Sequence, residues 1–135
     1  MSDSDFVGIP YIFYGDDFKG TNCLGLCRLF YKEHGWPENF LDGKPITKDW
    51  QEQDRTRLIR YLRDKFDETK DIQSLEYGDL ILFEINGDYH MGIVLDYGDV
   101  LSMQVPCIEG QASSTIYHRR WWTPFFRRGF KRRKV

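Results

Sequence analysis

The sequence is short of cysteine, histidine and long apolar runs. Its 135 residues include three cysteines and three histidines. Three thiols cannot all pair, and Cys23 and Cys27 stand one helical turn apart, so we expect free thiols in a reducing compartment rather than a disulfide framework. No apolar run is long enough to cross a bilayer, which predicts a chain without a membrane span.

The scarcity of cysteine and histidine also argues against a zinc site. Structural zinc needs two ligand pairs at short spacings, and Cys23-x3-Cys27 has no second matching pair. We therefore predict no metal and no other cofactor. The first residues, Met1 to Asp5, lack the basic and apolar regions of a signal peptide, which predicts a protein that is made in the cytoplasm and not exported by the usual route.

The composition predicts one compact domain over residues 1–135. Apolar residues make up 41% of the chain and aromatic residues 16%, enough for one sizeable core. The charge is uneven, because eight of the 19 Lys and Arg residues fall in residues 119–135, which hold no Asp or Glu. We expect a basic, aromatic C-terminal extension whose aromatic residues close the core and whose charged end is solvated or contacts an anionic polymer or another protein. Binding of nucleic acid is the weaker alternative, since the acidic remainder would repel a polyanion.

A small-residue turn leads into the most informative stretch, Gly20 to Tyr31. Its apolar residues recur every three or four positions, which predicts a helix that begins near Cys23 and ends at Gly35. At a helix N-terminus the backbone N–H groups are unpaired and the dipole favours negative charge. Thiol pKa values at such positions fall to roughly 3.5–7.5 when a histidine is close. We therefore predict that Cys23 is a nucleophile; the alternative is the buried structural cysteine that most free thiols are.

Along the rest of the chain, the sequence predicts a second helix followed by strands. We expect loops at residues 8–15 and 36–48, and a helix from Trp50 to Phe66 that starts with a capping box of Asp49 and Glu52. Alternating residues predict strands at 79–85, 89–95 and 100–105, with a fourth within 113–122, and Asn86-Gly87-Asp88 is a hairpin turn. Helices packed on an antiparallel sheet make an α+β fold.

His90 is the candidate base, because it opens the second predicted strand and packing of the helix on the sheet can bring it to Cys23. It would take the thiol proton and return it to the departing amine. Ser102 and Gln104 face one way on the third strand, so either could hydrogen-bond the second ring nitrogen of His90. The alternative is that both are ordinary strand residues. Cys107, like Cys27, is predicted to be structural.

Four segments in this order resemble the motifs of the NlpC-type cell-wall cysteine peptidases. They are Gly8-Ile9-Pro10-Tyr11, Gly20-Thr21-Asn22-Cys23-Leu24-Gly25-Leu26, Gly78-Asp79-Leu80-Ile81-Leu82-Phe83 and His90-Met91-Gly92-Ile93-Val94-Leu95. In that family a papain-like α+β core places the cysteine at the start of a helix and the histidine on the second sheet strand. The Cys-Leu-Gly-Leu version followed by an arginine looks most like the branch encoded by tailed bacteriophages.

The resemblance implies hydrolysis of peptidoglycan stem peptides, commonly between D-glutamate and the diamino acid. Cys23 matches the nucleophile and His90 the base. Tyr11 matches a tyrosine that lines the cleft beside the thiol, and a plain core aromatic is the alternative. Asn22 matches a position, usually aspartate, that helps to recognise the free amino end of the peptide. Ser102 departs from the histidine most often found at its position, which leaves Gln104 or a water-bridged pair to orient the base.

Two function classes follow from the residues and the resemblance. The first is a tail-borne cysteine endopeptidase, part of the virion, that opens the cell wall locally during DNA entry and assembles with other tail proteins in the host cytoplasm. The second is a tail-assembly or hub protein that keeps the papain-like fold with little or no activity. The absence of the usual third polar residue is the best support for the second.

Overall fold

A six-stranded antiparallel sheet forms the centre of the protein. The computed structural model describes residues 2–38 and 40–134. The strands lie in the order β3-β8-β4-β5-β6-β7. They are β3 (Asp67–Thr69), β4 (Leu80–Ile85), β5 (Asp88–Val94), β6 (Val100–Met103), β7 (Ser114–Tyr117) and β8 (Phe126–Lys131). A separate small hairpin joins β1 (Asp16–Asp17) and β2 (Gly20–Thr21).

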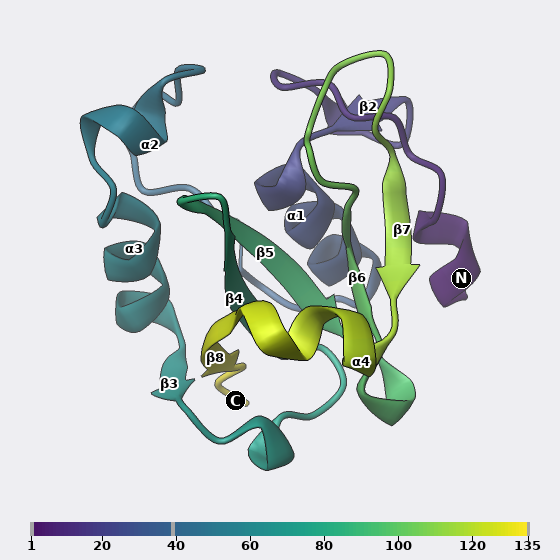
Figure 1. Cartoon of the computed structure of the whole chain (residues 1–135), viewed down its shortest axis with the longest axis vertical. Coiled ribbons are helices and arrows are strands. Elements are labelled where there is room, and N and C mark those ends of the chain that lie inside the picture. The colour runs from purple at the N-terminus through teal and green to yellow at the C-terminus, as the bar shows by residue number, and fades with distance from the viewer. Residues whose placement is uncertain (1, 39, 135) are drawn as a thin grey trace.

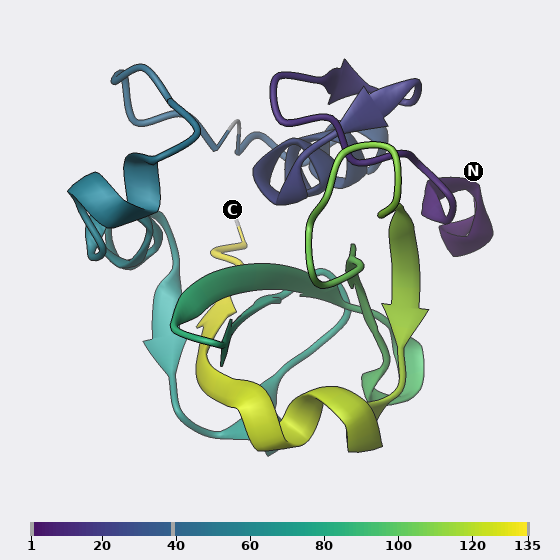
Figure 2. The same ribbon diagram turned by 45° about the horizontal axis from the view of Figure 1, so that its top comes forward.

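Helices cover both faces of this sheet (Figure 1). They are α1 (Cys23–Glu33), α2 (Trp50–Gln53), α3 (Arg57–Lys65) and α4 (Arg119–Trp122), with short 3₁₀ turns at Asp3–Phe6, Ile72–Ser74, Asp96–Gly98 and Thr123–Phe125. The tilted view shows α1 on one side of the sheet and α4 across the other (Figure 2). Met91 is buried in the core layer with α1, and Trp122 in the second layer. The predicted α+β fold is therefore confirmed.

The turn between β4 and β5 has the geometry that its sequence predicts. Asn86 and Gly87 have positive φ values of 53° and 85°, as a type I′ turn requires. This turn sets the register in which Phe83 lies opposite His90. Because side chains alternate along a strand, His90 and Phe83 share one face of the sheet, whereas Met91 belongs to the face that packs on α1.

The two edges of β5 are paired to different extents. β4 pairs with residues 88–93 of β5, whereas β6 pairs only with Ile93 and Val94. The first half of β5 is therefore open on the β6 side. Backbone groups there need other partners, and the hydroxyl of Ser102 supplies one by donating a 2.7 Å hydrogen bond to the Met91 carbonyl.

The helix predicted from Trp50 to Phe66 is two helices, so that prediction is wrong in its middle. The chain leaves helical geometry at Asp54, where φ is −151°. The Asp54 carboxylate accepts hydrogen bonds from the Thr56 N–H and from the guanidinium of Arg60, and local bonds of this kind compete with a continuous helix. The predicted capping box is also wrong, since the residue before α2 makes no side-chain cap bond.

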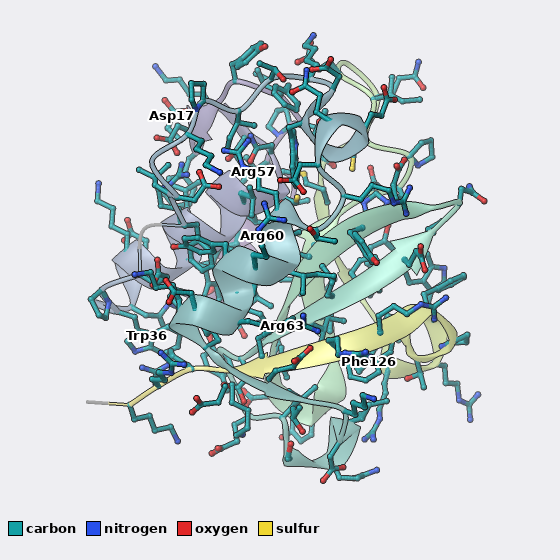
Figure 3. All side chains as sticks on the ribbon, turned by 90° about the vertical axis from the view of Figure 1, so that its left-hand side faces the viewer. Asp17, Trp36, Arg57, Arg60, Arg63 and Phe126 are labelled. Atoms are coloured by element: carbon teal, nitrogen blue, oxygen red, sulfur yellow. The ribbon has the colours of Figure 1, made fainter. Side chains whose placement is uncertain are left out.

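The basic C-terminal stretch forms part of the sheet and is not an appendage. β8 lies between β3 and β4, and Figure 3 shows Phe126 at the start of this strand. Arg127 pairs with Glu84 of β4 at 3.0 Å, and Lys131 pairs with the buried Asp79 at 3.1 Å. Arg127, Arg128, Lys131, Arg133 and Lys134 of this basic stretch form ion pairs with acidic residues, most of them at the surface. Residues 126–131 are thus a strand of the sheet and not part of an extension.

The N-terminal segment brings its residues to the start of α1. Pro10 forms a bridge with Ser113, and Tyr11 forms one with Thr21. Because Thr21 is followed after one residue by Cys23, these bridges place the segment beside the candidate nucleophile. Within the two described ranges no helix combines the length and the apolar character needed to cross a membrane.

Candidate active site

Asn22 fixes the start of α1. Its side-chain oxygen accepts a 2.8 Å hydrogen bond from the Gly25 N–H, which is an N-cap contact. The helix therefore begins at Cys23, as the sequence predicts. A glycine suits position 25, because a Cβ there would lie 2.0 Å from the Thr21 hydroxyl oxygen. The local sequence thus delivers the thiol to a helix terminus.

Cys23 and His90 line the same cavity. Its volume is about 820 Å³, within the range of roughly 300–1,000 Å³ that is usual for ligand sites. Its walls come from the start of α1, the tip of the β4–β5 hairpin, the loop after β6 and the segment around α4. Both residues are partly exposed. The structure therefore brings together the two residues that the sequence predicts to be nucleophile and base.

The surroundings of the Cys23 sulfur favour the neutral thiol in the free protein. Burial raises the pKa of the Cys23 thiol, and hydrogen bonds from the backbone N–H groups of Met91, Leu24 and Cys23 itself act in the opposite direction. The prediction of a lowered thiol pKa is therefore wrong, because desolvation outweighs the helix terminus. The same N–H groups converge where negative charge would develop on the sulfur or on an adjacent oxyanion.

An aromatic ring, rather than a polar group, supports His90. Its imidazole stacks on Phe83 with ring centroids 5.7 Å apart and an interplanar angle of 25°. Burial lowers the pKa of His90, and the Asp88 carboxylate opposes that decrease. In the part of the chain that the structure describes, no hydrogen bond joins the imidazole to the Cys23 sulfur or to another group. Catalytic contacts are often longer in a free site than in a complex.

Within the described ranges neither Ser102 nor Gln104 hydrogen-bonds to His90, so the structure gives the predicted orienting role no support. Ser102 is buried, and its hydroxyl donates to the Met91 carbonyl. The side-chain oxygen of Gln104 accepts a 3.0 Å hydrogen bond from the Ser113 N–H. The cause is the divergence of β6 from the first half of β5. Ser102 therefore holds the peptide next to His90 without touching the ring.

Tyr11 and Asn22 both line the cavity, but the side chain of Asn22 is already hydrogen-bonded to the backbone. Burial, together with the nearby Cys107 and Cys23, raises the pKa of the Tyr11 phenol, which stays protonated. The amide nitrogen of Asn22 donates to the Phe13 carbonyl at 2.5 Å while its oxygen caps α1. Both polar atoms of this amide are engaged with the backbone, so the structure gives the predicted substrate-binding role of Asn22 no support.

Several residues that line the cavity were not predicted as site residues from the sequence, among them Cys107, Trp121 and Asp88. Cys107, expected to be structural, is partly exposed and lines the cavity. Trp121 and Asp88 line it as well. Only Asp88 carried a signal in the sequence, since it stands two residues before His90 on an alternating strand. Cys27, in contrast, is buried in the core, where it was expected.

The groups gathered in this cavity suit acyl transfer. A thiol at a helix terminus, backbone donors around its sulfur and a neutral imidazole in one cavity are the parts that attack on an amide carbonyl requires. The exposed side chains of Lys48 and Glu52 also line the cavity.

Comparison with known proteins finds a family model and solved structures that are similar to most of this chain. A model of the NlpC/P60 family matches residues 8–128. Among solved structures, the NlpC/p60 domain of the peptidoglycan hydrolase SagA superimposes with a TM-score of 0.55 and 19% identity, over 93% of this chain and 89% of that chain. No curated protein matches the sequence.

A second solved structure is a protein similar to a lipoprotein of the NLP/P60 family from Staphylococcus aureus. It has a TM-score of 0.55 and 18% identity, over 95% of this chain and 38% of that chain. The chain thus spans well under half of that protein. At these identities the two structures show a shared fold.

Proposed function

The chain belongs to the NlpC/P60 family of peptidoglycan hydrolases, which are cysteine peptidases, and on that premise we propose that it is an endopeptidase of peptidoglycan stem peptides. Cys23 is its nucleophile, and His90 is its general base and acid. The bond cleaved is the one between D-glutamate and the diamino acid. The observation that carries this proposal is the cavity that Cys23 and His90 share.

The reaction starts from a neutral pair. Burial raises the pKa of the Cys23 thiol and lowers the pKa of His90, so neither group is charged before the substrate binds. His90 takes the thiol proton while the sulfur attacks the amide carbonyl. Negative charge then develops on the carbonyl oxygen, where the N–H groups of Cys23, Leu24 and Met91 stabilise it.

The second half of the cycle reverses the proton transfer. The imidazolium of His90 gives its proton to the departing amine, and the acyl half of the peptide remains on Cys23 as a thioester. His90 then takes a proton from water, which attacks the thioester and releases the carboxylic acid. The thiol regains its proton, so the cycle is balanced without a cofactor.

The setting of this activity is the tail of a bacteriophage. The protein is made in the host cytoplasm, assembles with other tail proteins and opens the wall during DNA entry. The Cys-Leu-Gly-Leu motif and the arginine that follows it, Arg28, support this setting. A tail-assembly protein with little activity is the second candidate, and the lack of a hydrogen-bonding partner for the His90 ring in the described ranges favours it.

Digestion of purified peptidoglycan separates the two candidates. Wild type, Cys23→Ala and Cys107→Ser are incubated with the polymer, and new amino ends and fragment masses are measured. We expect new amino ends on the diamino acid, with partner fragments that end in D-glutamate, from wild type and Cys107→Ser, and none from Cys23→Ala. If wild type releases no fragments although it is folded, the enzyme proposal fails and the assembly role stands.

A further inference from the structure

One carboxylate stands beside the histidine without a counter-charge. Asp88 and His90 are two residues apart on β5, so their side chains lie on the same face, about 6.5–7 Å apart along the strand. Both line the cavity. Asp88 is exposed, and across residues 2–38 and 40–134 no ion pair or hydrogen bond involves its carboxylate. This carboxylate is therefore available to a ligand.

Apolar surface continues from Asp88 on the same face. Ile85 lies directly opposite Asp88 in the hairpin. Trp121 and Phe125 also line the cavity, and the centre of the Trp121 ring lies 6.4 Å from the centre of the Phe83 ring, on which His90 stacks. Trp121 keeps 38% of its surface exposed, although its ring is stacked on Tyr117 with centroids 3.9 Å apart. The cavity wall next to His90 is therefore an apolar strip that ends at a carboxylate.

The mechanism decides which part of the substrate meets this strip. Because His90 delivers the proton to the departing amine, the residue that supplies this amine lies on the His90 side of the Cys23 sulfur. The acyl half lies on the other side, toward Tyr11, which the bridge to Thr21 holds beside the start of α1. The strip therefore faces the diamino residue.

We propose that Asp88, together with Trp121, forms a subsite for the leaving residue that takes a long methylene chain ending in a free ammonium group. The methylene groups pack on the indole, and the ammonium pairs with the carboxylate. A stem peptide whose side-chain amine is already joined to another stem carries no such charge. The enzyme would therefore select stems that are not cross-linked. This inference rests on the proposed peptidase function.

The other charged groups of the cavity do not serve the same purpose. Glu109 accepts a 2.8 Å hydrogen bond from the Phe13 N–H, so its carboxylate is tied to the N-terminal segment. The ammonium of Lys48 lies 6.0 Å from the centre of the Tyr14 ring. Glu52 belongs to α2, a different wall of the cavity. Glu52→Gln is therefore a matched control, because it removes one negative charge from the same cavity at another place.

Two synthetic stem peptides test the subsite. One is L-Ala-γ-D-Glu-L-Lys-D-Ala, and the other is the same peptide with the lysine Nε acetylated; kcat/KM is measured for each. We expect wild type and Glu52→Gln to prefer the free amine by about tenfold or more. We expect Asp88→Asn to lose that preference, mainly through slower cleavage of the free-amine peptide.

A pH profile checks that Asp88 does not act only through His90. The Asp88 carboxylate raises the pKa of His90, so its removal shifts the acidic limb of kcat/KM to lower pH for both peptides equally. The preference between peptides is a separate readout. Equal cleavage of both peptides by wild type, or an equal loss on both in Asp88→Asn, overturns the subsite and leaves the peptidase proposal standing. Cleavage of peptidoglycan but of neither peptide also overturns it, and cleavage of none of the three substrates overturns both proposals.

Discussion

The two halves of β5 differ in how their backbone is paired, although they belong to one continuous strand. Ile93 and Val94 lie between β4 and β6, and their side chains are buried. The half from Asp88 to Met91 is paired with β4 alone, and the start of α1 and the cavity occupy its other edge. The comparison teaches that one strand can anchor the core with one half and present side chains to a cavity with the other.

The divergence of β6 makes this division possible. A partner strand along the whole of β5 would satisfy the Met91 backbone groups and close the edge. Instead the Ser102 hydroxyl bonds the Met91 carbonyl, and the Met91 N–H faces the Cys23 sulfur. Changes in the open half should therefore alter chemistry, and changes in the paired half should alter stability.

The largest effect is expected from His90→Gln in the open half. Without a general base, kcat/KM on the stem peptide should fall by about 10²- to 10⁴-fold. The urea midpoint should change little, because His90 is partly exposed and only stacks on Phe83. A variant that keeps more than a tenth of wild-type kcat/KM would refute the assigned role.

Ile93→Ala tests the paired half. Ile93 is fully buried, so the cavity left by truncation should lower the free energy of unfolding by about 2–5 kcal/mol. Urea denaturation followed by circular dichroism measures this loss. At temperatures where the variant is folded, we expect kcat/KM per folded molecule close to wild type. An unchanged denaturation midpoint would contradict the division between the halves.

Ser102→Ala tests the residue that joins the two halves. It leaves the Met91 carbonyl without its donor, which should cost about 1–3 kcal/mol of stability. The pH dependence of kcat/KM should not move, since Ser102 does not touch the His90 ring. Ser114→Ala is the matched control, because it removes another buried hydroxyl that donates to a carbonyl, that of Phe6. If the acidic limb of the kcat/KM pH profile shifts in Ser102→Ala but not in Ser114→Ala, then Ser102 does orient the base.

The smallest effect is on the pH dependence of stability. Burial lowers the pKa of His90 in the folded state, so the unfolded chain binds a proton here more readily. Stability should therefore fall as the pH drops through about 6.5, the ordinary pKa of histidine. His90→Gln should show a weaker fall. Thermal unfolding between pH 5 and pH 8 measures the difference, and identical curves would contradict a partly buried imidazole with a lowered pKa.

Local patterns predicted much of the fold and pointed to Cys23 and His90, which line one cavity. Helical periodicity after a small-residue turn predicted the start of α1 at Cys23, and the Asn86-Gly87 turn predicted the β4–β5 hairpin. These features depend on neighbouring residues alone. The Cys23 and His90 assignment also needed the order of motifs along the chain, because packing of α1 on β5 is not local.

Long-range packing explains what could not be predicted. β8 became a central strand because Phe130 is fully buried between distant elements, and the basic composition of its surroundings hid this. The pKa of Cys23 depends on burial, which sequence position does not reveal. The role of Ser102 depends on where β6 leaves β5, and strand alternation by itself cannot locate that point.

Detection of the acyl-enzyme is the most direct test of Cys23 as the nucleophile. The protein is mixed with the lysine stem peptide, quenched in acid within the first turnovers, and examined by intact-mass spectrometry followed by peptide mapping. We expect a mass increase equal to the acyl half of the peptide, located on Cys23. An adduct on Cys107, or cleavage products formed at the wild-type rate by Cys23→Ala, would contradict it.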